Sequence, residues 1–167
     1  PAIVYGVESS GVSNSMLKDM IGIAAAAVSP PGMGRNPRLA LHAISPMSVA
    51  VDPSYAVHVL PIKAWATAWW DEWVDHGELQ AAYKLAAKAL GKAKTTVWSM
   101  VTGPAAAVVA TCSRIGWHSA DGRVFVDDMG DEHDIALNPL VALMAAAKRS
   151  VDRWTFEQSL SQLPAAG

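Results

Sequence analysis

Apolar residues recur at three- and four-residue spacing between positions 16 and 28, which puts them on one face of an α-helix. The members of this face are Met16, Leu17, Met20, Ile21, Ala24, Ala27 and Val28. Ser13 precedes the face and is expected to cap the helix, because its hydroxyl can accept unpaired backbone N–H groups of the first turn. Pro30 follows the face, and proline cannot continue a helix. The pattern therefore predicts a helix that starts after Ser13 and ends near Val28.

A second helical pattern runs from Pro61 to Asp75, where tryptophans recur every four residues at Trp65, Trp69 and Trp73. A further helix is predicted from Glu78 to about Ala93. Its expected inner face consists of Leu79, Ala82, Ala86 and Leu90. Because only a tight connection separates the two helices, we predict an αα-hairpin over about residues 61–93.

The pattern changes to β-prone residues after position 114. Asp121-Gly122 is a hairpin signal, so strands are expected near Gly116–Ser119 and Arg123–Asp127, with a third candidate at Asp134–Leu137. A last helix is expected after Asn138-Pro139. Its apolar stripe consists of Leu140, Leu143 or Met144, Ala147, Val151 and Trp154.

These elements predict a mainly α protein, a helical bundle with an αα-hairpin at about 61–93 and a small β-hairpin at about 116–137 before a C-terminal helix. The other expected elements are a short helix over Pro37–Ile44, a turn or short helix opened by Asp52-Pro53, and a helix over Pro104–Arg114. We expect two regions: a helical region over 1–114, and a β-hairpin plus C-terminal helix lobe over 115–167.

Composition narrows the class of protein. The chain has 167 residues, of which 51% are hydrophobic and 17% are charged, and this is atypical of a disordered chain. Uninterrupted apolar runs such as Ile23–Val28 are far shorter than the roughly 20 residues that cross a bilayer, so no transmembrane segment is expected. The single cysteine, Cys112, excludes an internal disulfide framework and suits an intracellular reducing compartment.

Charge is distributed unevenly although the net charge is only -2. The segment from Leu79 to Arg114 contains basic residues and no acid, while Ser119–Leu137 is acidic. The candidate nucleic-acid-binding residues are Lys84, Lys88 and Lys92 on the outer helix face, with a second cluster at Lys148, Arg149 and Arg153. Each lysine of such a row could neutralise a phosphate. The alternative is that the row is a plain solvated face, or that the basic and acidic segments attract each other.

Phe125-Val126-Asp127-Asp128 has the aromatic-x-Asp-Asp pattern with which reverse transcriptases hold two metal ions on a hairpin. Asp127, Asp128 and Asp131 are therefore the candidate metal ligands. Such catalysis needs a third carboxylate and a fingers-and-palm body, and neither is evident. The alternative interpretation is a polar, solvated turn. A hydrolase or metal-dependent nuclease using this hairpin is a further alternative.

The tryptophan stripe has two interpretations as well. Indole faces on one helix side could stack the bases of a single-stranded nucleic acid. Aromatic residues at helical spacing are also typical of a core. Asp71, Glu72 and Asp75 share the helix and would repel phosphate, which favours the core.

The opening Pro1-Ala2-Ile3-Val4-Tyr5-Gly6-Val7-Glu8 resembles the P-x-x-x-Y-G-x-E stretch of LINE-type (non-LTR) retrotransposon polyproteins, where the polymerase palm gives way to the helical thumb. Matching pieces continue along the chain, as in retroelement-like open reading frames of dinoflagellates and other protists. These pieces are Asp52-Pro53, Pro61-Ile62 with the Trp-rich helix, Ile115-Gly116-Trp117, Val124–Asp128 and Val151-Asp152-Arg153-Trp154.

This resemblance implies a thumb and linker whose helices grip a template–primer duplex, with the catalytic carboxylates upstream of the chain. The expected function is therefore a non-catalytic nucleic-acid-binding segment, with no cofactor and no small-molecule substrate. The alternative is a structural or accessory subunit of a larger assembly, held by neighbouring protein subunits on its Ala, Trp and Met surfaces.

Overall fold

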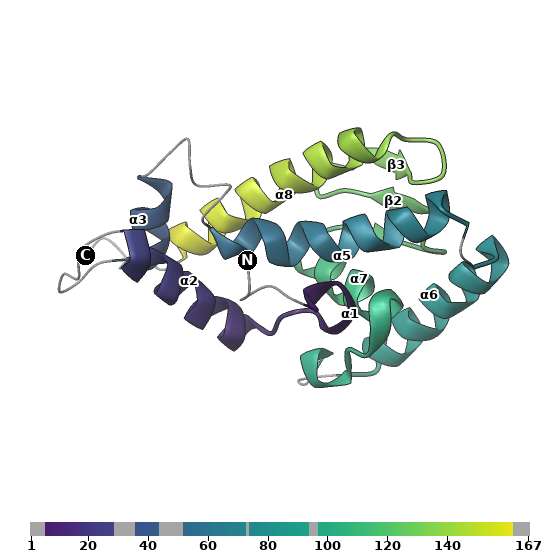
Figure 1. Ribbon diagram of the computed structural model, residues 1–167, viewed down its shortest axis with the longest axis horizontal. Helices are drawn as coiled ribbons and strands as arrows, with labels where there is room; N and C mark the ends of the chain where they lie inside the picture. The colour runs from purple at the N-terminus through teal and green to yellow at the C-terminus, as the bar shows by residue number, and fades with distance from the viewer. Residues whose placement is uncertain (1–5, 29–35, 44–51, 73, 94–96, 162–167) are drawn as a thin grey trace.

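The computed structural model describes residues 6–28, 36–43, 52–72, 74–93 and 97–161, and these residues form helices and one small sheet (Figure 1). The helices are α1 (Val7–Ser10), α2 (Asn14–Val28), α3 (Pro37–His42), α5 (Pro53–Trp70), α6 (His76–Gly91), α7 (Gly103–Arg114) and α8 (Leu140–Leu160), with a 3-10 helix η2 (Val97–Met100). The strands are β1 (His118–Ser119), β2 (Val124–Val126) and β3 (Glu132–Asp134). This architecture confirms the predicted mainly α class with a hairpin-like sheet and a C-terminal helix.

Several helices begin where the apolar period predicts. The Ser13 hydroxyl accepts the N–H of Met16 at 3.2 Å and caps α2 as expected. Leu17, Met20 and Ile21 on its apolar face are buried. None of the described helices is long and apolar enough to cross a membrane. Trp73 and the opening stretch 1–5 lie outside the described residues.

The start of α5 differs from the prediction, because Pro61 lies inside the helix rather than in its first turn. Asp52 caps the helix instead, and its Oδ1 accepts the Ser54 N–H at 2.8 Å. Proline removes one backbone hydrogen bond from a helix interior. The Pro61 side chain is fully buried, and its packing in the core offsets that loss.

The two helices expected over 61–93 are present, but they diverge from their connection (Figure 1). They meet through aromatic rings near the turn. The ring centres of Trp69 and His76 are stacked 4.6 Å apart, and those of Trp65 and Tyr83 lie 5.8 Å apart. Beyond this point α6 packs along α7. The inner face of α6 carries Tyr83, whereas Ala82, predicted to face inward, is exposed, since the ring of Tyr83 fills the space under the sheet.

The sheet is antiparallel in the order β1-β2-β3. Its third strand occupies Glu132–Asp134, earlier than the predicted Asp134–Leu137. The reason is the turn before it, where Asp127 Oδ1 accepts the N–H groups of Met129 and Asp131 at 2.9 and 3.0 Å. This tight turn lets pairing resume at Glu132, opposite Val126.

The largest core lies between α5, α7, α8 and the sheet, and it contains residues from both sides of position 115. Its buried indoles find hydrogen-bond acceptors across the fold: Trp65 Nε1 donates to the Gly122 carbonyl at 2.7 Å, and Trp117 Nε1 donates to Ser150 Oγ at 2.8 Å. A second core joins α2 to Leu41 and Val57. The division into regions at 114/115 stays a prediction.

Replacing Gly122 by alanine tests how the sheet is held on the helices. Gly122 has φ +78°, and a Cβ there would lie 2.5 Å from the Tyr83 ring. We expect Gly122→Ala to lower the free energy of unfolding by about 2–5 kcal/mol, because backbone strain and overpacking add. Gly130→Ala is the matched control, since Gly130 has φ +90° with open space around it. Urea unfolding measures both, and equal losses would contradict the contact with Tyr83.

Candidate functional site

The predicted basic row lies on the outer side of α6. Lys84, Lys88 and Lys92 are all exposed, at successive four-residue steps, and Lys92 is the C-cap residue directly after the last residue of α6. Among the described residues none of the three forms an ion pair. The structure therefore leaves three ammonium groups in solvent along one helix face.

The second basic cluster lies on α8, where Lys148 and Arg149 are exposed. Arg153 is engaged within the chain, since its guanidinium forms a bidentate ion pair with Asp128 at 2.5 and 2.7 Å. Figure 1 shows α8 on one side of α5 and α6 on the other, so the two clusters do not form one continuous row.

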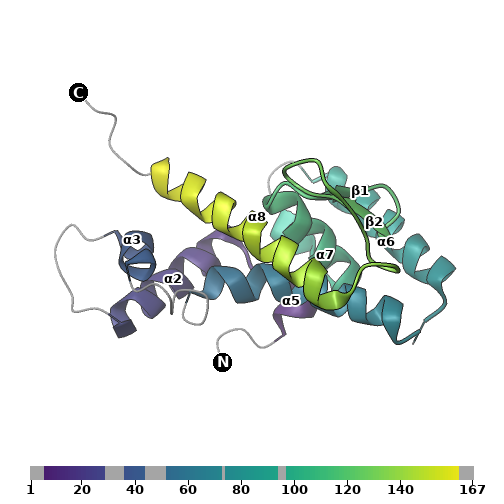
Figure 2. The ribbon, with the colours of Figure 1, turned by 90° about the horizontal axis from the view of Figure 1, so that it is seen from above.

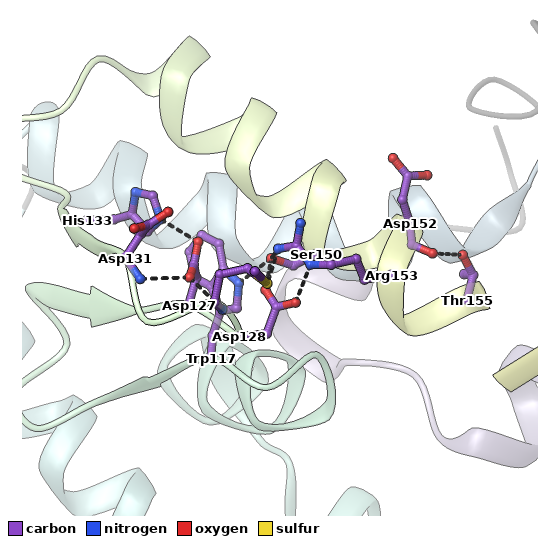
Figure 3. A network of polar contacts seen from close by, with 10 residues as sticks. Trp117, Asp127, Asp128, Asp131, His133, Ser150, Asp152, Arg153 and Thr155 are labelled. Carbon is purple, nitrogen blue, oxygen red and sulfur yellow. Dashed lines mark hydrogen bonds and ion pairs between the residues drawn. The ribbon is translucent and has the colours of Figure 1, made fainter. Parts of the chain in front are cut away.

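The acidic turn after β2 is an ordered network (Figure 3). Asp127 is buried, and its Oδ2 accepts from His133 Nε2 at 3.0 Å, while the imidazole stacks on Trp117 at 5.1 Å. Burial raises the pKa of Asp127, but the hydrogen bonds from His133, Asp131 and Met129 outweigh it and hold the pKa below its ordinary value. The carboxylate is therefore ionised and fully used in closing the turn.

Asp128 connects this turn to α8. Its carboxylate accepts from Arg153 and from Ser150 Oγ at 2.5 Å, while Ser150 in turn accepts from Trp117. The hydrogen bonds from Arg153, followed by that of Ser150, lower the pKa of Asp128 against the opposing effect of burial. This network fixes the sheet to the middle of α8 (Figure 3).

The three metal candidates are not brought together as ligands. Asp131 is exposed, whereas Asp127 and Asp128 direct their carboxylates to different partners. No group of three or more His, Cys, Asp or Glu side chains that could hold a metal ion occurs in the described part of the chain. In the tryptophan stripe, Trp65 and Trp69 are buried in the main core, so their faces are not presented to solvent.

Sequence analysis missed a cavity of about 300 Å³ between α2, α3, α7 and α8. Its walls include the buried Arg38 and the half-buried Arg114, from helices far apart in the sequence. Trp154 of α8 forms part of the wall, and the Arg38 guanidinium lies 5.1 Å from its ring centre. A local sequence pattern carries no signal for such a site, because it depends on how four helices pack.

Comparisons with protein-family models, with curated proteins and with solved structures found no match.

Replacing Asp128 by asparagine tests the turn network through its pH dependence. A carboxylate with a lowered pKa stabilises the fold above the unfolded value of about 3.9, and this stabilisation is lost as pH falls through the lower folded value. We expect Asp128→Asn to lower the free energy of unfolding at pH 7 by about 1–3 kcal/mol, because Arg153 and Ser150 lose a charged acceptor. The difference from wild type should shrink below about pH 4. Urea titrations at pH 7, 5 and 3 measure it.

Asp131→Asn is the matched control, because Asp131 belongs to the same turn with an exposed side chain. It should change stability by less than about 0.5 kcal/mol at every pH. A loss for Asp128→Asn that stays the same at pH 3 and pH 7 would contradict the role of its charge.

Proposed function

We propose that the chain is a non-catalytic nucleic-acid-binding segment, related to the region after the polymerase palm of LINE-type reverse transcriptases, and that α6 contacts the phosphates. One observation supports this most directly: Lys84, Lys88 and Lys92 project from one face of α6 without an intramolecular ion pair among the described residues. Exposed lysines in a row are suited to phosphate groups, since each contact releases a condensed counterion.

The spacing of the row fits a polyanion. A helix rises about 1.5 Å per residue, so lysines four residues apart follow each other at about 6 Å, and the row is about 12 Å long. The acidic residues of α6 and its N-cap, Glu78 and Asp75, lie at the N-terminal end of the helix, away from the lysine row. Phosphates can therefore approach the C-terminal half of α6 without passing a carboxylate of that helix.

A non-catalytic role is supported by the acidic turn. The oxygens of Asp127 and Asp128 accept hydrogen bonds from His133, Arg153 and Ser150, which would have to be displaced before the carboxylates could bind a metal. Lys148 and Arg149 on α8 extend the proposal as a separate contact with a longer duplex.

An accessory-subunit role is the second candidate, favoured by apolar side chains that α8 leaves in solvent. Val141 is 82% exposed near its start, and Phe156 and Leu160 are 61% and 50% exposed one turn apart near its end. A protein partner could cover these side chains, because buried aromatic and aliphatic anchors dominate stable interfaces.

Replacing the lysine row tests the proposed function. The triple variant Lys84→Gln, Lys88→Gln, Lys92→Gln should bind a fluorescent RNA–DNA hybrid more weakly at 50 mM salt. Each lost contact should reduce the slope of log K against log salt by roughly 0.7–0.9, so the triple variant should lose about 2–3. Fluorescence anisotropy over a salt series measures both quantities.

Lys63→Gln is the control, because Lys63 is an exposed lysine on α5 outside the row. It should leave the slope unchanged. Absence of hybrid, duplex and single-strand binding by the wild-type chain at low salt would refute nucleic-acid binding, and a stable complex with a protein partner would then support the accessory role.

A further inference from the structure

The cavity between α2, α3, α7 and α8 combines buried positive charge with apolar walls. Lys18, Arg38 and Arg114 contribute three cationic groups to its lining, and no carboxylate lines it among the described residues. Leu17 and Ile21 provide apolar surface on one side. A cavity of about 300 Å³ lies at the lower end of the range for small-molecule sites.

Arg38 gives the strongest evidence for an anion site. The residue is only 9% exposed, and its Nη1 is buried with no hydrogen-bond partner. Burial lowers its pKa more than the attraction of Asp52 raises it. Asp52 forms no ion pair with it within 4 Å, and its Oδ1 is engaged in capping α5. A buried guanidinium with an unused N–H group is costly unless an anion or water completes it.

Arg114 repeats the arrangement on the other side. Its Nη2 donates to the Val12 carbonyl, and its guanidinium carbon Cζ lies 3.7 Å from the centre of the Trp98 ring. Its Nε is buried without a hydrogen-bond partner. Burial lowers its pKa to about 10, so the group remains charged at neutral pH. The chain thus holds two desolvated guanidinium groups in fixed positions without a carboxylate partner among the described residues.

His58 holds the Arg114 side chain in place through a hydrogen bond. Its Nδ1 lies 2.6 Å from the Ser54 carbonyl and donates to it, which leaves Nε2 as an acceptor for Arg114 Nη1 at 3.4 Å. Burial is the main cause that lowers the pKa of His58 to about 3, so the ring is neutral and adds no charge of its own. Its ring also lies 4.8 Å from Trp154, the aromatic wall of the cavity.

We propose that this cavity binds a phosphate monoester that carries a small, flat apolar group. Arginine guanidinium groups match phosphate oxygens in geometry as well as in charge, and a dianion suits three cations better than a monoanion does. The phosphate accepts from Arg38 and Arg114, Lys18 closes the site from the exposed rim, and the apolar group lies against Trp154. This inference does not depend on the lysine row of α6.

Phenyl phosphate is the probe, with benzoate and benzyl alcohol as the monoanionic and neutral comparisons. Isothermal titration of the whole chain should give one saturable site for phenyl phosphate, and the indole N–H resonance of Trp154 should shift. We expect Arg38→Met to weaken binding by about tenfold or more, and Lys18→Met by several-fold. Lys18 is exposed, so its variant keeps the test informative if Arg38→Met does not fold. Lys63→Met is the control and should bind as wild type does.

Competition separates the two sources of such a phosphate. Displacement of phenyl phosphate by a 5′-phosphorylated dinucleotide, and not by its 5′-hydroxyl form, assigns the site to a nucleic-acid end, and no displacement assigns it to a small molecule. The proposal is overturned if wild type gives no binding, if benzoate or benzyl alcohol binds as tightly as phenyl phosphate, or if neither Lys18→Met nor a folded Arg38→Met alters the affinity.

Discussion

The packing of α5 against α8 is the contact on which the rest of the structure depends. The two long helices run antiparallel through the molecule, as Figures 1 and 2 show. Ala66 and Ala147 are fully buried, and such small side chains let helix backbones approach closely. The middle of α8 holds the sheet, because Ser150 accepts a hydrogen bond from Trp117, which precedes β1. One turn further along α8, Trp154 packs against both the main core and the core around α2. Weakening the contact between α5 and α8 would therefore destabilise the main core and the core around α2 together.

Helices were predictable where a strong apolar period ended at a clear signal. The Ser13 cap of α2 and the helix before Arg114 are examples, because capping and periodicity are local properties. The position of Pro61 inside α5 was not predictable, since it depends on burial that other elements provide. That α6 packs against α7 also could not be predicted from the sequence. An apolar period shows which face of a helix is buried, but it does not show which other helix covers that face.

The candidate sites divide in the same way. The solvent-facing row Lys84, Lys88 and Lys92 could be inferred from spacing, because residues four apart share a helix face. The role of Arg153 could not, since its partner Asp128 comes from another element and turns an apparent binding residue into a structural one. The arginine cavity was equally hidden, because Arg38 and Arg114 are distant in sequence and each looks like an ordinary polar residue in isolation.

The α6 lysines and the cavity arginines attract anions in physically different environments. The net charge of -2 indicates neither group of cations. The α6 lysines lie in solvent, so their attraction for an anion is spread over a surface and is screened within about 8–10 Å at physiological salt. The cavity arginines are desolvated, so their interaction with an anion is less screened but demands a matching shape. A surface of the first kind suits a long polyanion of any sequence, whereas a site of the second kind selects one small group. The fold can therefore present both without either determining the other, since the lysines belong to α6 and the cavity is lined by residues of α2, α3, α7 and α8.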